Sequence, residues 1–227
     1  MTTMAVSVHP LDFLLPQRCA ICGRIAEAIC AVCLGALVRV SPPCCERCGA
    51  PGPWPVRRCA ECSGRRLAFR SARAALVYDD RARRLVRAWK EHGRRDIAEA
   101  AADLVVDALA RPHASVLAFV PADPDRRLRR GHAPPEALAR ELGARWQLPV
   151  ERLLGRCRPL PRQRGLGLAE RRRNVRGAFA ARARAPTSVC LVDDVYTSGA
   201  TASACATALR RAGARRVGVV TLARAIR

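Results

Sequence analysis

The chain has 227 residues, enough for one ordinary α/β domain and a small additional module. Half of the residues are hydrophobic, which supports a buried core and argues against wholesale disorder. No stretch approaches the roughly 18 apolar residues of a membrane-spanning helix, and the first residues carry no pattern of a secretion signal. We therefore expect a soluble cytoplasmic protein without membrane insertion.

The net charge of +22 comes almost wholly from arginine, because Lys90 is the only lysine in the chain. A surface this basic favours polyanions such as nucleic acid, or phosphorylated metabolites. A GC-rich genome that encodes arginine in place of lysine would produce the same composition. Charge alone therefore leaves DNA binding and genome bias as alternatives.

Cysteine spacing points to metal. Nine of the twelve cysteines fall within positions 19–62, and eight of them form four Cys-x-x-Cys pairs: Cys19/Cys22, Cys30/Cys33, Cys45/Cys48 and Cys59/Cys62. Without a secretion signal, this pattern indicates zinc rather than disulfides. Two such knuckles complete one tetrahedral site, so we expect one or two structural zinc ions. Neighbouring pairs could share a metal, or the first could join the third and the second the fourth.

The zinc module is predicted to cover residues 1–66 and an α/β domain residues 67–227. Roughly 60 residues rich in Pro, Arg and Cys bury too little apolar surface to fold without metal. Asp96 is the expected N-cap of the second helix. In chain order, hydrophobic patterns predict strand 74–78, helix 81–89, helix 96–109, strand 115–120, helix 133–142, strand 188–192, helix 202–212 and strand 217–222.

Apolar strands separated by helices predict a mainly parallel sheet flanked by helices on both faces. The stretch 156–176 interrupts this pattern with eight arginines, two prolines and two glycines. We interpret it as a basic flap over a site, or as a solvated loop.

Residues 189–201 carry the most specific pattern. An apolar strand, 189–192, leads to Asp193 and Asp194, at the edge of the sheet where α/β proteins bind ligands. The Thr-Ser-Gly-Ala-Thr run at 197–201 offers backbone N–H groups, hydroxyls and a helix N-terminus to a phosphate. The two carboxylates suit ribose hydroxyls, or a metal carried by the substrate. Neither a Walker A loop nor a Gly-x-Gly-x-x-Gly turn is present.

This loop is similar to the phosphoribosyl-pyrophosphate motif of type I phosphoribosyltransferases. The four cysteine pairs, Trp89–Gly93, Val120-Pro121, Arg130-Gly131-His132 and the run from Gln163 to Phe179 extend the likeness. Over residues 19–225 the chain resembles the ComF family. The resemblance implies a double zinc ribbon followed by a type I phosphoribosyltransferase-like domain, and a link to DNA uptake in competence.

The resemblance also implies roles for individual residues. Asp193 and Asp194 would form the catalytic pair at the ribose, and Lys90 would meet the pyrophosphate with its Mg²⁺. The remaining expected ligand contacts are Arg130, Gly131, Arg172 and Asn174 toward the pyrophosphate or flap, and Val195, Tyr196, Thr197, Ser198, Gly199, Ala200 and Thr201 around the 5-phosphate. The chain departs from the family pattern at His132-Ala133-Pro134, where Phe-Asn-Gln is usual.

The function expected from these features is binding of phosphoribosyl pyrophosphate, with transfer of the phosphoribosyl group to a nitrogen acceptor that the sequence does not identify. One alternative is a non-catalytic protein of DNA uptake or repair that handles single-stranded DNA and uses the loop as a ligand sensor. Another is a zinc-mediated module that docks a helicase-type partner of DNA uptake.

Overall fold

The computed structural model describes residues 17–91, 93–125, 128, 131–158 and 174–226. The expected positions Arg130 and Arg172, and most of the expected flap, lie outside these ranges. Among the described helices, none has the length and apolar character needed to cross a bilayer.

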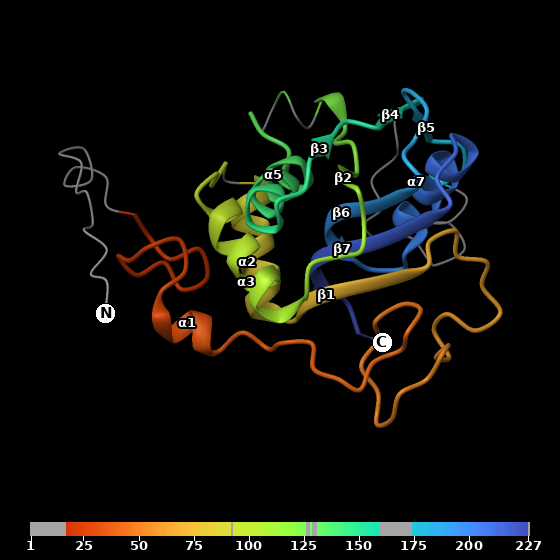
Figure 1. Cartoon of the computed structure of the whole chain (residues 1–227). Helices are drawn as coiled ribbons and strands as arrows, with labels where there is room; N and C mark the ends of the chain where they lie inside the picture. The colour runs from red at the N-terminus through yellow and green to blue at the C-terminus, as the bar shows by residue number, and fades with distance from the viewer. Residues whose placement is uncertain (1–16, 92, 126–127, 129–130, 159–173, 227) are drawn as a thin grey trace.

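A five-stranded sheet forms the centre of the molecule (Figure 1). Each neighbouring pair of strands is parallel, which confirms the expected mainly parallel sheet. The inner strands are buried on both faces, as their continuous apolar runs require. The spatial order is β1 (Ser71–Val77), β7 (Arg216–Arg224), β6 (Ser188–Tyr196), β2 (Val116–Phe119) and β3 (Val150–Glu151).

Helices cover both faces of the sheet (Figure 1). One face carries α2 (Asp80–Glu91), α3 (Ile97–Ala108) and α5 (Pro134–Trp146), and the other carries α7 (Ala200–Arg211) with the antiparallel pair β4 (Leu154–Arg156) and β5 (Phe179–Ala181). Side chains alternate along β6 between the two layers: Cys190 and Val192 join the core on the α2 side, and Val189 and Leu191 join the core on the α7 side.

The ends of several elements differ from the sequence expectation. The strand expected at 188–192 runs to Tyr196, because β6 stays paired with β7 as far as Tyr196 opposite Arg224. Asp193 and Asp194 therefore lie inside the strand. The strands β3, β4 and β5 were not predicted, since two or three residues are too few to show a periodicity.

Asp96 occupies the expected N-cap position, but it does not cap the helix with its side chain. Asp96 does precede α3, but its carboxylate makes no capping hydrogen bond. It instead forms a two-pronged ion pair with Arg94, with 2.6 Å between Nη2 and Oδ2. The nearby guanidinium offers a charge-assisted partner that outcompetes the backbone N–H groups of the first turn.

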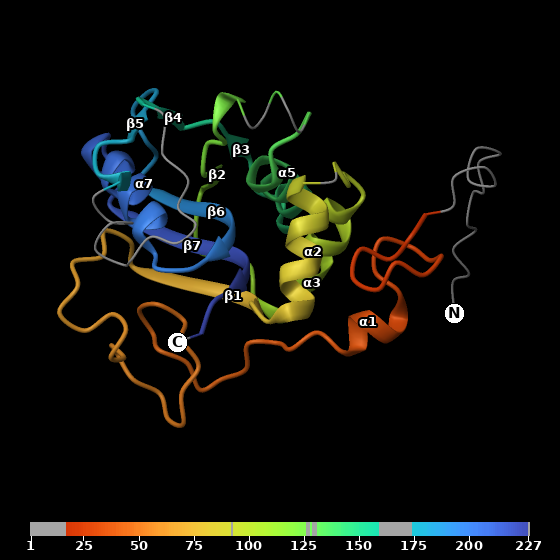
Figure 2. The same ribbon diagram turned by 180° about the vertical axis from the view of Figure 1, so that it is seen from behind.

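The N-terminal zinc module spans both layers. Its short helix α1 (Ala31–Gly35) is followed by residues 38–40, which run along the outer edge of β1. There the Val40 N–H donates to the Ala75 carbonyl over 2.9 Å, and the Val77 N–H donates to the Val38 carbonyl over 2.8 Å. The first cysteine group packs into the core on the α2 side and the second into the core on the α7 side. Figure 2 shows α1 of the module on the side of α2 and α3.

Candidate functional site

The cysteines form two separate four-sulfur clusters. Cys19, Cys22, Cys30 and Cys33 make the first cluster, and Cys45, Cys48, Cys59 and Cys62 make the second, with the sulfur atoms of each cluster within 4.8 Å of one another. Neighbouring knuckles therefore share a site, and the cross-braced wiring is not the one adopted.

The spacing of the sulfur atoms fits tetrahedral zinc. Sγ atoms lie 3.8 Å apart for Cys22 and Cys30, and 3.6 Å apart for Cys45 and Cys62. Zinc–sulfur bonds of about 2.3 Å in a tetrahedron put ligand sulfurs about 3.8 Å apart. Four sulfur ligands leave no open coordination position, so both sites suit structural rather than catalytic zinc.

The thiols have electrostatic environments that a cation would balance. Burial opposes ionisation of Cys45, but backbone N–H groups of Cys48, Cys59 and Arg47 outweigh it and lower its pKa to about 6. In the first cluster, burial and the neighbouring thiols raise the pKa of Cys33 to about 12. Crowded thiols cannot all lose their protons without a compensating positive charge, and Zn²⁺ supplies that charge when bound.

The second feature of the molecule is a group of charges at the carboxyl end of β6. Lys90, near the end of α2, places its Nζ atom 2.6 Å from Oδ1 of Asp194. The Asp194 side chain is only 10% exposed and that of Lys90 29% exposed, so the pair is largely shielded from water. The only lysine of the chain thus meets a carboxylate 104 positions away in the sequence.

The two carboxylates of β6 point to opposite faces of the sheet, as neighbouring strand residues do. Asp194 faces Lys90 on the α2 side, whereas Asp193 interacts electrostatically with Arg156 of β4 and Cys205 of α7 on the other side. Burial, and then the charge of Asp194, raise the pKa of Asp193 to about 7. Asp193 is therefore readily protonated near neutral pH.

Arg156 is ordered, although the sequence had suggested that it begins a flap. Its Nε donates to the Pro121 carbonyl over 2.9 Å, and its Nη1 lies 3.4 Å from the Asp123 carboxylate. The guanidinium also stacks over the Phe179 ring at 5.6 Å. These contacts hold Arg156 beside the ends of β2 and β6, so it adds a cation to the carboxyl edge of the sheet.

The loop after β6 makes a sharp entry into α7. Gly199 has a φ of +68°, a left-handed conformation that glycine adopts without strain, and α7 begins at the next residue. The Ala200 N–H donates to the Ser198 hydroxyl over 3.3 Å. Thr197 and Thr201 are half-buried and flank this turn, so the hydroxyls and helix N-terminus expected from the sequence lie together.

The other expected contact residues are distributed differently. The Tyr196 side chain is buried beneath the loop, while Val195 packs against the core on the α2 side. Gly131 has a φ of +68° and lies in the turn before α5. The neighbouring His132 donates from Nε2 to the Trp89 carbonyl over 2.7 Å, which brings this turn against α2 next to Lys90. Asn174 lies near the end of the expected flap, and its carbonyl accepts from Arg158 over 2.7 Å.

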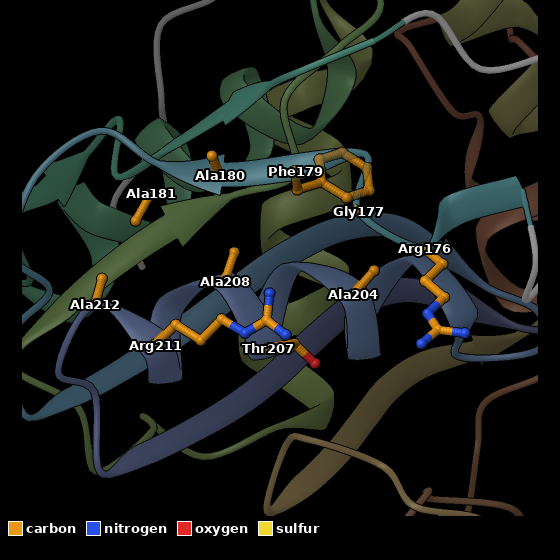
Figure 3. A pocket seen from close by; sticks show the side chains of 10 residues that line it. All are labelled: Arg176, Gly177, Phe179, Ala180, Ala181, Ala204, Thr207, Ala208, Arg211 and Ala212. Carbon is orange, nitrogen blue, oxygen red and sulfur yellow. The ribbon is translucent and has the colours of Figure 1, made fainter.

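A hollow of about 590 Å³ between β5 and α7 was not predicted (Figure 3). Alanines from both elements form its floor, and the exposed Arg176 and Arg211 lie toward its two ends. A second hollow of about 270 Å³ continues from Arg176 toward the zinc module and includes Arg66. Alanine recurs at every fourth residue of α7, and this spacing could have indicated a helix face without large side chains.

Comparison with known proteins identifies relatives of the chain and of its zinc module. Residues 10–64 match the double zinc ribbon domain family. The chain is 30% identical over 212 residues to two proteins named DNA utilization protein YhgH, from Salmonella typhimurium and Salmonella typhi; each alignment covers 87% of this chain and 91% of the relative. A crystal structure of TT1426 from Thermus thermophilus aligns at 20% identity and a TM-score of 0.30, over 56% of this chain and 72% of that one.

The two-cluster geometry predicts two zinc ions per chain by metal analysis. Cys22→Ser and Cys62→Ser should each lower the content to one, because each removes a ligand from a different cluster. Cys44→Ser is the matched control: its thiol donates to the Ser41 carbonyl and belongs to neither cluster. A fall in zinc content in that control would contradict the assignment of ligands.

The raised pKa predicts that Asp193→Asn stabilises the ligand-free protein at alkaline pH. The unfolded chain releases this proton near its ordinary pKa of 3.8, whereas the folded chain keeps it to about pH 7. Stability therefore falls as the pH rises through that window, and asparagine removes the loss. Each unit of pKa shift corresponds to about 1.4 kcal/mol, and solvent screening reduces this value. We therefore expect the effect of Asp193→Asn on the free energy of unfolding to be more favourable by roughly 1–3 kcal/mol at about pH 8 than at about pH 4.5.

Denaturant unfolding at both pH values measures this difference. Asp107→Asn, which removes an exposed carboxylate of α3, is the control. Equal effects of Asp193→Asn at the two pH values would show that Asp193 titrates normally.

Proposed function

The chain belongs to the family of the DNA utilization protein YhgH, and we propose that it binds phosphoribosyl pyrophosphate at the carboxyl edge of its sheet. In this proposal the 5-phosphate occupies the 197–201 loop, the ribose hydroxyls face Asp193 and Asp194, and the pyrophosphate reaches Lys90. The proposal rests chiefly on the contact between Lys90 and Asp194.

The ion pair supports the proposal because the Lys90 ammonium group could exchange its carboxylate partner, Asp194, for a ligand anion. In the free protein Lys90 neutralises Asp194 across 2.6 Å in a largely shielded position. A pyrophosphate carries more negative charge than one carboxylate and would draw the ammonium group to itself. Asp194 would then be released to accept a hydrogen bond from a ribose hydroxyl. Without ligand the two charges balance each other, so neither Lys90 nor Asp194 is left as an isolated buried charge.

The loop supports binding of a phosphate for a second reason. Residues 197–201 carry no acidic side chain, and they lead directly into the N-terminus of α7. The backbone N–H groups of such a turn and the positive end of the helix both favour a phosphate. The turn therefore supplies the anion site, and the strand before it supplies the acceptors for the sugar.

We extend the proposal to transfer of the phosphoribosyl group to a nitrogen nucleophile. The departing pyrophosphate would leave positive charge on the ribose ring, which the carboxylates on β6 would stabilise. Mg²⁺ would accompany the pyrophosphate and neutralise its charge. Lys90 would hold the leaving group on the opposite side of the ribose from the 5-phosphate loop.

Calorimetric titration with phosphoribosyl pyrophosphate and Mg²⁺ tests the site. Asp194→Asn and Lys90→Ala should each weaken binding about 10- to 100-fold, the range expected for losing one hydrogen bond to a charged group. Asp107→Asn, on an exposed face of α3, should bind like the wild type. Unchanged affinity in Asp194→Asn, or no binding by the wild type, would refute the proposal. Pyrophosphate release with a nitrogen acceptor tests transfer separately.

A second candidate function is the binding of single-stranded DNA, favoured by the hollow between β5 and α7 (Figure 3) and the second hollow that adjoins it. Arg66, Arg176 and Arg211 are exposed, and the residues that line the two hollows include no acidic side chain. A phosphodiester backbone matches a row of guanidinium groups, and the name of the relatives refers to the use of DNA. This surface lies on the α7 layer, and its second hollow reaches the 197–201 loop at Ala200.

The double variant Arg176→Ala/Arg211→Ala should weaken binding of a single-stranded oligonucleotide. The slope of log affinity against log salt should become shallower by about 0.7 for each arginine removed. Arg83→Ala is the control, since it removes an exposed arginine from α2 on the other layer. Equal losses in the control and the double variant would indicate attraction by net charge alone.

A further inference from the structure

A buried arginine at the end of β7 joins the second zinc cluster to the ligand loop. The Arg224 side chain is 1% exposed and forms an ion pair of 2.6 Å with Glu61, which lies beside the zinc ligand Cys62. It also donates to the Cys48 carbonyl, and its Nη2 lies 3.6 Å from the Cys48 sulfur. The zinc module thus supplies the anion and the carbonyl that make burial of this guanidinium tolerable.

The same guanidinium supports the floor of the ligand loop. It stacks over the Tyr196 ring at 4.7 Å from the centroid. Tyr196 also makes an edge-to-face contact with Phe69, with ring centroids 6.2 Å apart. A Cβ atom at Gly199 would overlap the Tyr196 hydroxyl, so the ring lies directly against the turn that begins α7. A chain of three contacts therefore runs from Cys48 through Arg224 and Tyr196 to Gly199.

A second connection fixes the orientation of a peptide in the loop. Arg65, which follows Cys62 in the zinc module, donates to the Ser198 carbonyl. In a planar trans peptide the carbonyl and the following N–H point in opposite directions. Holding the Ser198 carbonyl toward Arg65 therefore points the Gly199 N–H away from the zinc module. Phosphate-binding turns need their N–H groups fixed in this way before the ligand arrives.

The first zinc cluster has no comparable contact with the 197–201 loop among the described residues. It packs into the core on the α2 side, and no hydrogen bond among the described residues connects it to residues 197–201. The two clusters therefore have the same chemistry but different relations to the ligand loop.

We propose that Arg65 and Arg224 are positioning residues that couple zinc at the second cluster to the affinity of the 197–201 loop for a phosphate. Loss of that zinc would remove the anchor of both guanidinium groups, and the loop would lose its fixed peptide. This coupling rests on the proposed function. Because coupling between two binding sites is reciprocal, a phosphate in the loop must also make the second zinc harder to remove.

Ribose 5-phosphate is the probe for the first test, because it can fill the loop without a pyrophosphate that reaches Lys90. Arg65→Ala should weaken its binding about tenfold, within the usual range of coupling between sites. The zinc content should stay at two per chain and the melting temperature should stay near that of the wild type. Arg58→Ala is the control: it removes an exposed arginine of the zinc module that lines neither hollow, and it should leave affinity unchanged.

The second test measures zinc release to a chromogenic chelator. In Cys22→Ser, which keeps only the second zinc, ribose 5-phosphate should raise about tenfold the chelator concentration that removes half of the zinc at equilibrium. In Cys62→Ser, which keeps only the first zinc, the same ligand should leave that concentration unchanged. Arg224→Lys in the Cys22→Ser background should reduce the protection, since lysine keeps the charge but loses the forked contacts to Cys48 and Glu61.

The outcomes separate the two proposals. No binding of ribose 5-phosphate or phosphoribosyl pyrophosphate by the wild type would overturn the proposed function and, with it, the coupling. Ribose 5-phosphate affinity that is unchanged in Arg65→Ala, or zinc that is removed from Cys22→Ser by the same chelator concentration with and without ligand, would overturn the coupling alone. Equal protection of both zinc ions would do the same, because it would indicate general stabilisation.

Discussion

The pairing of β6 with β7 up to Tyr196 opposite Arg224 is the constraint on which the rest of the structure depends. It carries Asp194 to the side chain of Lys90, and it delivers the ligand loop directly after Tyr196. The same last pair of residues brings Arg224 under the loop and into the zinc module. A strand that ended at residue 192, as the apolar run alone indicates, would leave these groups on a loop without a fixed register.

The zinc module is built into the α/β domain rather than appended to it. Each cysteine cluster packs into a different core, and residues 38–40 cross between them along β1. A small module with little apolar surface of its own gains stability from both metal and shared cores. Arg65 joins the second cluster to Ser198, so a metal cluster and the candidate ligand loop are neighbours although their sequences are far apart.

The sequence predicts the zinc clusters and the parallel sheet, because cysteine spacing and apolar runs are local signals. A place for Lys90 at the same site as the acidic pair was expected only from the resemblance to the ComF family. It does not predict the opposite directions of Asp193 and Asp194, since that depends on how far β6 stays paired. Nor does it identify Arg224, one arginine among many, whose burial follows only from contacts with Glu61 and Cys48 brought from the other end of the chain. At Asp96 the sequence predicts a contact that the structure does not contain: the carboxylate pairs with Arg94 and does not cap α3.

The strip formed by residues 38–40 protects the sheet from pairing with other molecules. It occupies the outer edge of β1, an apolar strand that would otherwise present a row of unpaired N–H and C=O groups. Metal starvation or oxidation of the thiols would loosen the module that holds this strip in place. The bare edge could then pair with the same edge of another molecule, so zinc supply would govern solubility and turnover as well as shape.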